Sequence, residues 1–158
     1  MTQIKGAKIT MDEHRLLLAK VQSQQFQAAF ERCWNLNREF DLAPEYILGM
    51  PALMCAALSI EIGLKSLLIE SGTRPKKEHN LRLLLNALPP AIKAAIVDEV
   101  KAKYPDFQSQ IANAEKAFVT WRYFYESEEH IEVNILFVGA LGAADQKQLN
   151  LKWEEFSK

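Results

Sequence analysis

One segment, from about Pro51 to Ser71, limits most strongly what this chain can fold into. Proline is favoured in the first turn of a helix and glycine just past its last turn, and Pro51 and Gly72 stand at those places. The apolar residues between them point in almost every direction around the expected helix: Leu53, Met54, Ala57, Leu58, Ile60, Ile62, Leu64, Leu67 and Leu68. A helix that is apolar on all sides has to be covered on all sides. We therefore expect this segment at the centre of a helical bundle.

The segment before it predicts a long amphipathic helix over residues 10–39. Thr10 and Glu13 have the spacing of a capping box at the start of a helix. The apolar residues that follow recur at helical spacing: Leu17, Val21, Phe26, Phe30, Cys33 or Trp34, and Phe40. We expect these residues to face the core.

The second half of the chain predicts several shorter helices. Leucine-rich residues 81–88 and residues 91–103 form a short pair, and longer helices follow over 106–126 and from about Glu132. Because β-branched residues gather at 131–138, a short strand is an alternative to a helix there. Gly139 and Gly142 are best explained by close packing between helices. The fold class is therefore all-α, an antiparallel up-and-down bundle of four to five main helices plus a short helical pair, in a single domain over residues 1–158.

Composition bounds the location and the type of partner. The net charge of −1 excludes a broad basic footprint, so any contact with RNA or DNA requires a local site. Cys33 and Cys55 sit among apolar neighbours, as core cysteines do. Residues 1–10 show no apolar run of a secretory signal, and the nearly uncharged stretches 49–60 and 133–144 are short for a membrane span. We expect a cytoplasmic protein with no membrane contact.

Several kinds of chemistry lack their motifs. The sequence has no phosphate-binding glycine loop, no Glu-x-x-His pattern of di-iron bundles, no His/Cys spacing for zinc and no serine in a nucleophile elbow. We therefore expect no metal and no cofactor.

Two places carry charge where an apolar residue is expected. Glu61 and Lys65 are four residues apart on a helix face that also carries Leu58 and Leu68. A charge pair on such a face costs desolvation energy unless it is well paired. The pair is either a partly buried ion pair, a pair whose charged ends reach solvent at the bundle edge, or part of a functional site.

The second place is the segment 121–130. Arg122 lies on the face of its expected helix that also carries Phe118 and Tyr125, and an inward arginine needs a carboxylate or a phosphate. Glu61 and Glu126 are the candidate carboxylates. His130 lies in an acidic stretch and is either solvated or a proton-transfer group.

These residues together resemble a known family. Residues 57–85 combine Glu61-x3-Lys65, Gly72, a basic loop and His79-Asn80-Leu81 before a leucine-rich helix. Residues 121–126, Trp-Arg-Tyr-Phe-Tyr-Glu, follow on a later helix. Over about residues 51–141 this pattern is similar to the HEPN domain, the higher-eukaryote and prokaryote nucleotide-binding bundle. In that comparison His79 is the histidine that opens a helix, and we interpret it as a capping or packing residue rather than a base.

The resemblance implies a homodimeric bundle from a prokaryotic toxin–antitoxin or phage-defence system. Many members are metal-independent ribonucleases, in which an arginine binds phosphate and a histidine moves a proton. Four to six residues separate the two, and dimerisation brings two such motifs together. On this chain those residues are Arg122 and His130, with Glu61, Lys65, Tyr125 and Glu126 in support.

The spacing departs from the family pattern, because seven residues separate Arg122 from His130. Members without the motif are usually non-catalytic binding partners. Our first hypothesis is therefore a non-catalytic homodimeric subunit that binds RNA, a nucleotide or an antitoxin-type protein. The alternative is a ribonuclease that uses Arg122 and His130. A bundle enclosing a small apolar ligand is a third option.

Overall fold

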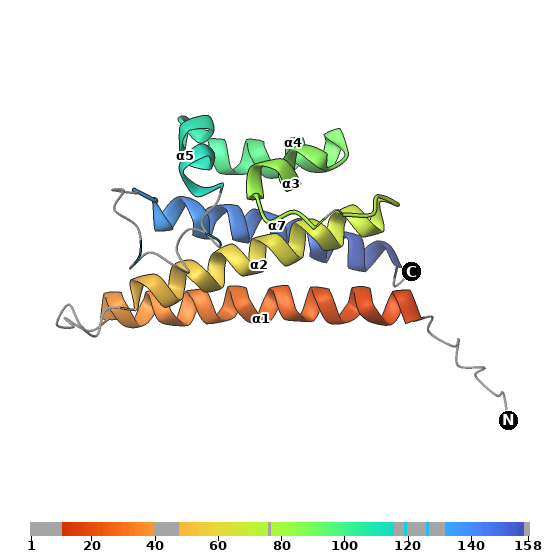
Figure 1. Ribbon diagram of the computed structural model, residues 1–158, viewed down its shortest axis with the longest axis horizontal. Coiled ribbons are helices and arrows are strands. Elements are labelled where there is room, and N and C mark those ends of the chain that lie inside the picture. The colour runs from red at the N-terminus through yellow and green to blue at the C-terminus, as the bar shows by residue number, and fades with distance from the viewer. Residues whose placement is uncertain are drawn as a thin grey trace, which may run out of the picture.

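Helix α2 (Gly49–Glu70) runs through the middle of the molecule, as its all-round apolar character predicts. The computed structural model describes residues 11–39, 48–75, 77–115, 119, 126 and 132–156. Helix α1 (Met11–Glu39) lies along one side of α2, and α7 (Ile135–Phe156) packs against both, with α1 antiparallel to each (Figure 1). All of the regular structure in these residues is helical. The predicted all-α fold is confirmed.

Three short helices cover the side of α2 and α7 opposite α1. They are α3 (Leu81–Ala87), α4 (Pro90–Lys101) and α5 (Phe107–Ala114) (Figure 1). Helix α3 packs on α2, and α4 packs on α7. The aromatic ring of Phe137 on α7 meets Phe107 and Tyr104 edge-on, with centroids 5.5 and 5.6 Å apart. These contacts close the core around α2.

Helix α2 ends at the predicted glycine. Gly72 has a φ of 78°, and its backbone N–H donates to the Ile69 carbonyl at 3.0 Å. The N–H of Thr73 donates to the Leu68 carbonyl at 2.9 Å. These two bonds form a Schellman motif, which reverses the chain so that the next loop runs back along α2 (Figure 1).

By length and composition α2 is also able to cross a membrane. Its most apolar window has a mean hydropathy of 1.8, and 67% of that window is buried inside the bundle. This window is longer than the nearly uncharged stretch of residues 49–60, because it also includes Glu61 and Lys65. Burial beneath α1, α3 and α7 accounts for its apolar character.

The inward face of α1 is more polar than the sequence predicts. Its buried residues are Lys20, Ser23, Gln27 and Phe30, whereas Val21, expected in the core, is 41% exposed. The polar side chains find partners on the neighbouring helices. Lys20 forms an ion pair with Glu70, and both side chains are buried. The prediction from the apolar pattern of α1 is therefore wrong for part of the face that packs against α2 and α7.

The serines of α1 and α2 bond to each other directly. Ser23 Oγ donates to the Ser59 carbonyl at 2.8 Å, and Ser59 Oγ donates to the Ser23 carbonyl at 2.7 Å. Gln146 of α7 adds a third member, because its Nε2 donates to Ser23 Oγ at 2.6 Å. One buried hydrogen-bond cluster thus joins α1, α2 and α7.

Glycines allow α7 to approach α1 closely, as predicted. A Cβ at Gly139 would lie 2.6 Å from the ring of Phe30, and a Cβ at Gly142 would lie 2.4 Å from Gln27 Oε1. Both distances are shorter than side chains tolerate without movement.

Other predictions have mixed outcomes. Residues 135–138 are helical, so the alternative of a strand there is wrong. The continuation of the helix expected over 106–126 falls mostly outside the described residues beyond Glu115. Cys33 and Cys55 are half-buried against the core, as expected.

Candidate functional site

The first unusual pair of the sequence, Glu61 and Lys65, forms a partly buried ion pair on α2. The Glu61 side chain is 7% exposed, and Lys65 Nζ lies 2.7 Å from its Oε1. This is one of the arrangements expected from their spacing. The lysine side chain is 23% exposed, so its charged end stands between the bundle and solvent.

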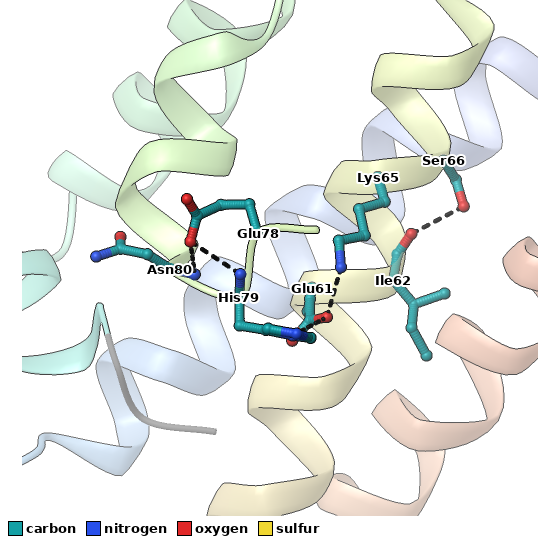
Figure 2. Close-up of polar contacts among 7 residues, drawn as sticks. All are labelled: Glu61, Ile62, Lys65, Ser66, Glu78, His79 and Asn80. Carbon is teal, nitrogen blue, oxygen red and sulfur yellow. Dashed lines mark hydrogen bonds and ion pairs between the residues drawn. The ribbon is translucent and has the colours of Figure 1, made fainter. Parts of the chain in front are cut away.

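A third side chain joins the pair from outside α2. His79 lies in the loop that returns along α2, and its Nδ1 is 2.9 Å from the same Glu61 Oε1 (Figure 2). The His79 side chain is 52% exposed. Glu61, Lys65 and His79 therefore form one cluster centred on a single carboxylate oxygen, which we call the Glu61 cluster.

Of the two roles predicted for His79, capping or packing, the structure does not support capping. Asn80 is the N-cap of α3, because its Oδ1 accepts from the backbone N–H of Leu83 at 3.0 Å. The His79 side chain instead points towards α2 (Figure 2). The histidine that opens the helix is thus available for contacts across the fold.

The backbone at His79 is fixed by its neighbour. Glu78 Oε1 accepts from the N–H of His79 at 2.9 Å and from the N–H of Asn80 at 2.8 Å (Figure 2). These two backbone hydrogen bonds lower the pKa of the Glu78 carboxyl, and the charges of His79 and Lys65 add to this effect. His79 is therefore held at its backbone by Glu78 and at its ring by Glu61.

The two oxygens of Glu61 differ in their contacts. Oε1 contacts Lys65 and His79, whereas no donor among the described residues bonds to the buried Oε2. Buried carboxylate oxygens usually accept at least one hydrogen bond.

The other predicted site residues are only partly tested. Arg122, Tyr125 and His130 lie outside the described residues, so their expected roles stay predictions. Glu126 is described and exposed. Of the six predicted site residues, the structure brings Glu61 and Lys65 together.

Sequence reasoning missed the contact between His79 and Glu61, which are 18 residues apart. One signal pointed towards it. An acid on an apolar helix face needs a partner, and a tight turn after Gly72 returns the following loop along that helix. The length of the returning loop does not by itself show which of its residues reaches Glu61.

Other kinds of site find less support. Among the described residues, no group of three or more His, Cys, Asp or Glu side chains is placed to hold a metal ion. A hollow of about 600 Å³ between α1 and the end of α2 is open to solvent, and its lining includes Asp12, Arg15 and Arg74. It differs from the enclosed apolar cavity that a carrier of apolar ligands needs.

Comparison with known proteins adds one match. A model of the HEPN domain family matches residues 51–140, which is more than half of the chain. No curated protein and no solved structure matches this chain. The matched residues run from α2 into α7 and include the whole Glu61 cluster, whereas α1 lies outside them.

Proposed function

This chain belongs to the HEPN domain family, and from that membership we propose a non-catalytic, homodimeric binding subunit of a prokaryotic toxin–antitoxin or defence system. Its place is the cytoplasm. The partner we propose is RNA, bound locally at the Glu61 cluster. Family members commonly dimerise, which supports the homodimer.

The Glu61 cluster is the observation that carries this proposal. It lies within the matched part of the chain and presents a half-exposed imidazole and a partly exposed ammonium group to solvent. The same loop carries Arg74 and Lys77, both exposed. Phosphate groups are bound by such cations, and a local cluster suits a chain whose net charge is −1.

The spacing of Arg122 and His130 supports binding over cleavage. Seven residues separate them, which is outside the family's range for catalytic members. A subunit that binds RNA without cutting it requires cations that hold phosphates but no proton-transfer pair.

A binding assay tests this function. The probe is a short fluorescent 2′-O-methyl oligoribonucleotide, which resists cleavage at the 2′ position, and the readout is anisotropy at low salt. Lys65→Met is expected to weaken binding several-fold, whereas Lys101→Met, an exposed lysine on α4, leaves it unchanged. Absence of binding by folded wild-type protein would overturn the proposed RNA binding. Light scattering measures the mass of the same protein, and a monomer would contradict the homodimer.

One observation favours ribonuclease activity as a second candidate. An imidazole whose Nδ1 is held by a buried carboxylate is an arrangement by which proteins orient a proton-transfer histidine, and His79 on Glu61 has it. The test is cleavage of cellular RNA and tRNA in excess chelator. Cleavage that His79→Asn abolishes would establish the enzyme and contradict the non-catalytic role, and Arg122→Ala and His130→Ala test whether the predicted pair takes part.

A further inference from the structure

The shared oxygen of Glu61 has a consequence for how the cluster responds to protons. We propose that His79 makes RNA binding proton-linked: the imidazole is protonated when a phosphate binds, so that affinity rises as pH falls through the range where histidine titrates. This inference rests on the proposed RNA binding and assigns its regulation to one residue.

The first step is that His79 is held in place before a ligand arrives. Its ring nitrogen Nδ1 lies 2.9 Å from Glu61 Oε1, and its backbone N–H is bonded to Glu78 at 2.9 Å. Its side chain is nevertheless 52% exposed. A ligand at the exposed part of the ring therefore meets an imidazole whose orientation is already set.

The second step is the local charge. Among the described residues, the charged groups near His79 include Glu61 and Lys65 from α2 and Glu78 from its own loop. Protonation of the imidazole adds one positive charge at this place. An RNA phosphate is attracted more strongly to the protonated ring than to the neutral one, so binding favours proton uptake by His79.

The third step is that Glu61 is able to hold the added charge. Its Oε2 is buried and receives no hydrogen bond from the described residues. A carboxylate stabilises a neighbouring cation more strongly in a partly buried site than in water. Protonation of His79 thus places a cation beside a partly buried carboxylate.

The experiment measures affinity for the same 2′-O-methyl oligoribonucleotide from pH 5.5 to 8.5 at constant ionic strength. The probe carries hydroxyl ends, because a terminal phosphate titrates near pH 6 and would add its own dependence. Wild-type affinity is expected to fall by up to about tenfold per pH unit above the pKa of the imidazole, the limit for uptake of one proton. His79→Asn keeps a donor for Glu61 but does not titrate, and is expected to flatten the profile.

His14→Asn is the matched control, because His14 is an exposed histidine on α1. It is expected to leave the profile unchanged.

The outcomes distinguish the two proposals. Wild-type binding that is independent of pH, or a pH dependence that persists in folded His79→Asn, overturns the proton linkage and leaves RNA binding intact. No binding at any pH overturns both. Calorimetry in two buffers of different ionisation enthalpy provides a second measurement, in which uptake of close to one proton by wild type and none by His79→Asn is expected.

Discussion

Asp145 on α7 lies directly against Gly63 on α2. A Cβ built at Gly63 would come within 1.8 Å of Asp145 Oδ2, so the carboxyl group occupies the space of the missing side chain. The aspartate is fully buried, and neither oxygen has a hydrogen-bond partner among the described residues. The α2–α7 contact therefore depends on both the small size of one residue and the protonation state of the other.

Substitution of Gly63 by alanine is expected to destabilise the protein by about 1–3 kcal/mol, the usual cost of overpacking. Asp145 has no exposed surface, so it cannot move aside into solvent. Urea unfolding measures the change. Asp145→Ala in the same chain is expected to recover part of the loss, and strictly additive costs would contradict this explanation.

Stability is expected to depend on pH through Asp145. Burial raises the pKa of this carboxyl well above its ordinary value of 3.8. Below 3.8 the group is protonated in both the folded and the unfolded chain. At higher pH the unfolded chain loses the proton first, so the stabilisation declines as pH rises from 3.8 through the raised folded-state pKa.

Asp145→Asn isolates this dependence, because the amide does not titrate. The free energy of unfolding of both proteins is measured from pH 4 to pH 8, and the difference between them is compared. Wild type is expected to lose stability relative to Asp145→Asn as pH rises. Carboxyls with a lowered pKa, such as Glu78, have the opposite sign but are common to both proteins. A difference that does not change with pH would contradict the prediction.

The buried ion pair between Lys20 and Glu70 is expected to show strong non-additivity. Its side chains are 6% and 3% exposed. Lys20→Met or Glu70→Leu alone removes one member of the buried pair and keeps the other charge buried, and each is expected to cost about 3–5 kcal/mol. The double variant is expected to cost much less than the sum, because it removes both charges. Equal costs for the double variant and the sum of the singles would show that the two charges act independently.

The cap of α3 is expected to contribute modestly. Asn80→Ala removes the acceptor for the Leu83 N–H and is expected to cost about 1 kcal/mol. Asn80→Asp keeps an acceptor at this position and serves as the control. Thermal unfolding of the three proteins checks the order, and an Asn80→Asp variant as unstable as Asn80→Ala would argue against the cap.

Local patterns predicted the helices well. The apolar character of α2 determined its central place, and Pro51 and Gly72 placed its ends to within two residues of the observed Gly49 and Glu70. The role of Gly139 and Gly142 in close packing was also readable, since little else explains glycine inside a helix. These features depend on residues near one another in the sequence.

Features that depend on distant partners were missed. The inward face of α1 carries Lys20, Ser23 and Gln27, and each is acceptable inside only because of what α2 and α7 place opposite it. For His79 the sequence left capping and packing open and did not predict the contact with Glu61, because the turn that directs it there is formed elsewhere. A polar contact between distant segments produces no recognisable residue spacing in either segment.

The polar face of α1 has a mechanical consequence for the whole bundle. Apolar helix surfaces tolerate sliding, because one methyl contact replaces another. A shift of α1 by one turn, about 5.4 Å, would separate Ser23 from Ser59 and Lys20 from Glu70 at the same time. A helix outside the matched family region thus holds α2 at a single axial position, and with α2 the carboxylate to which His79 is bound.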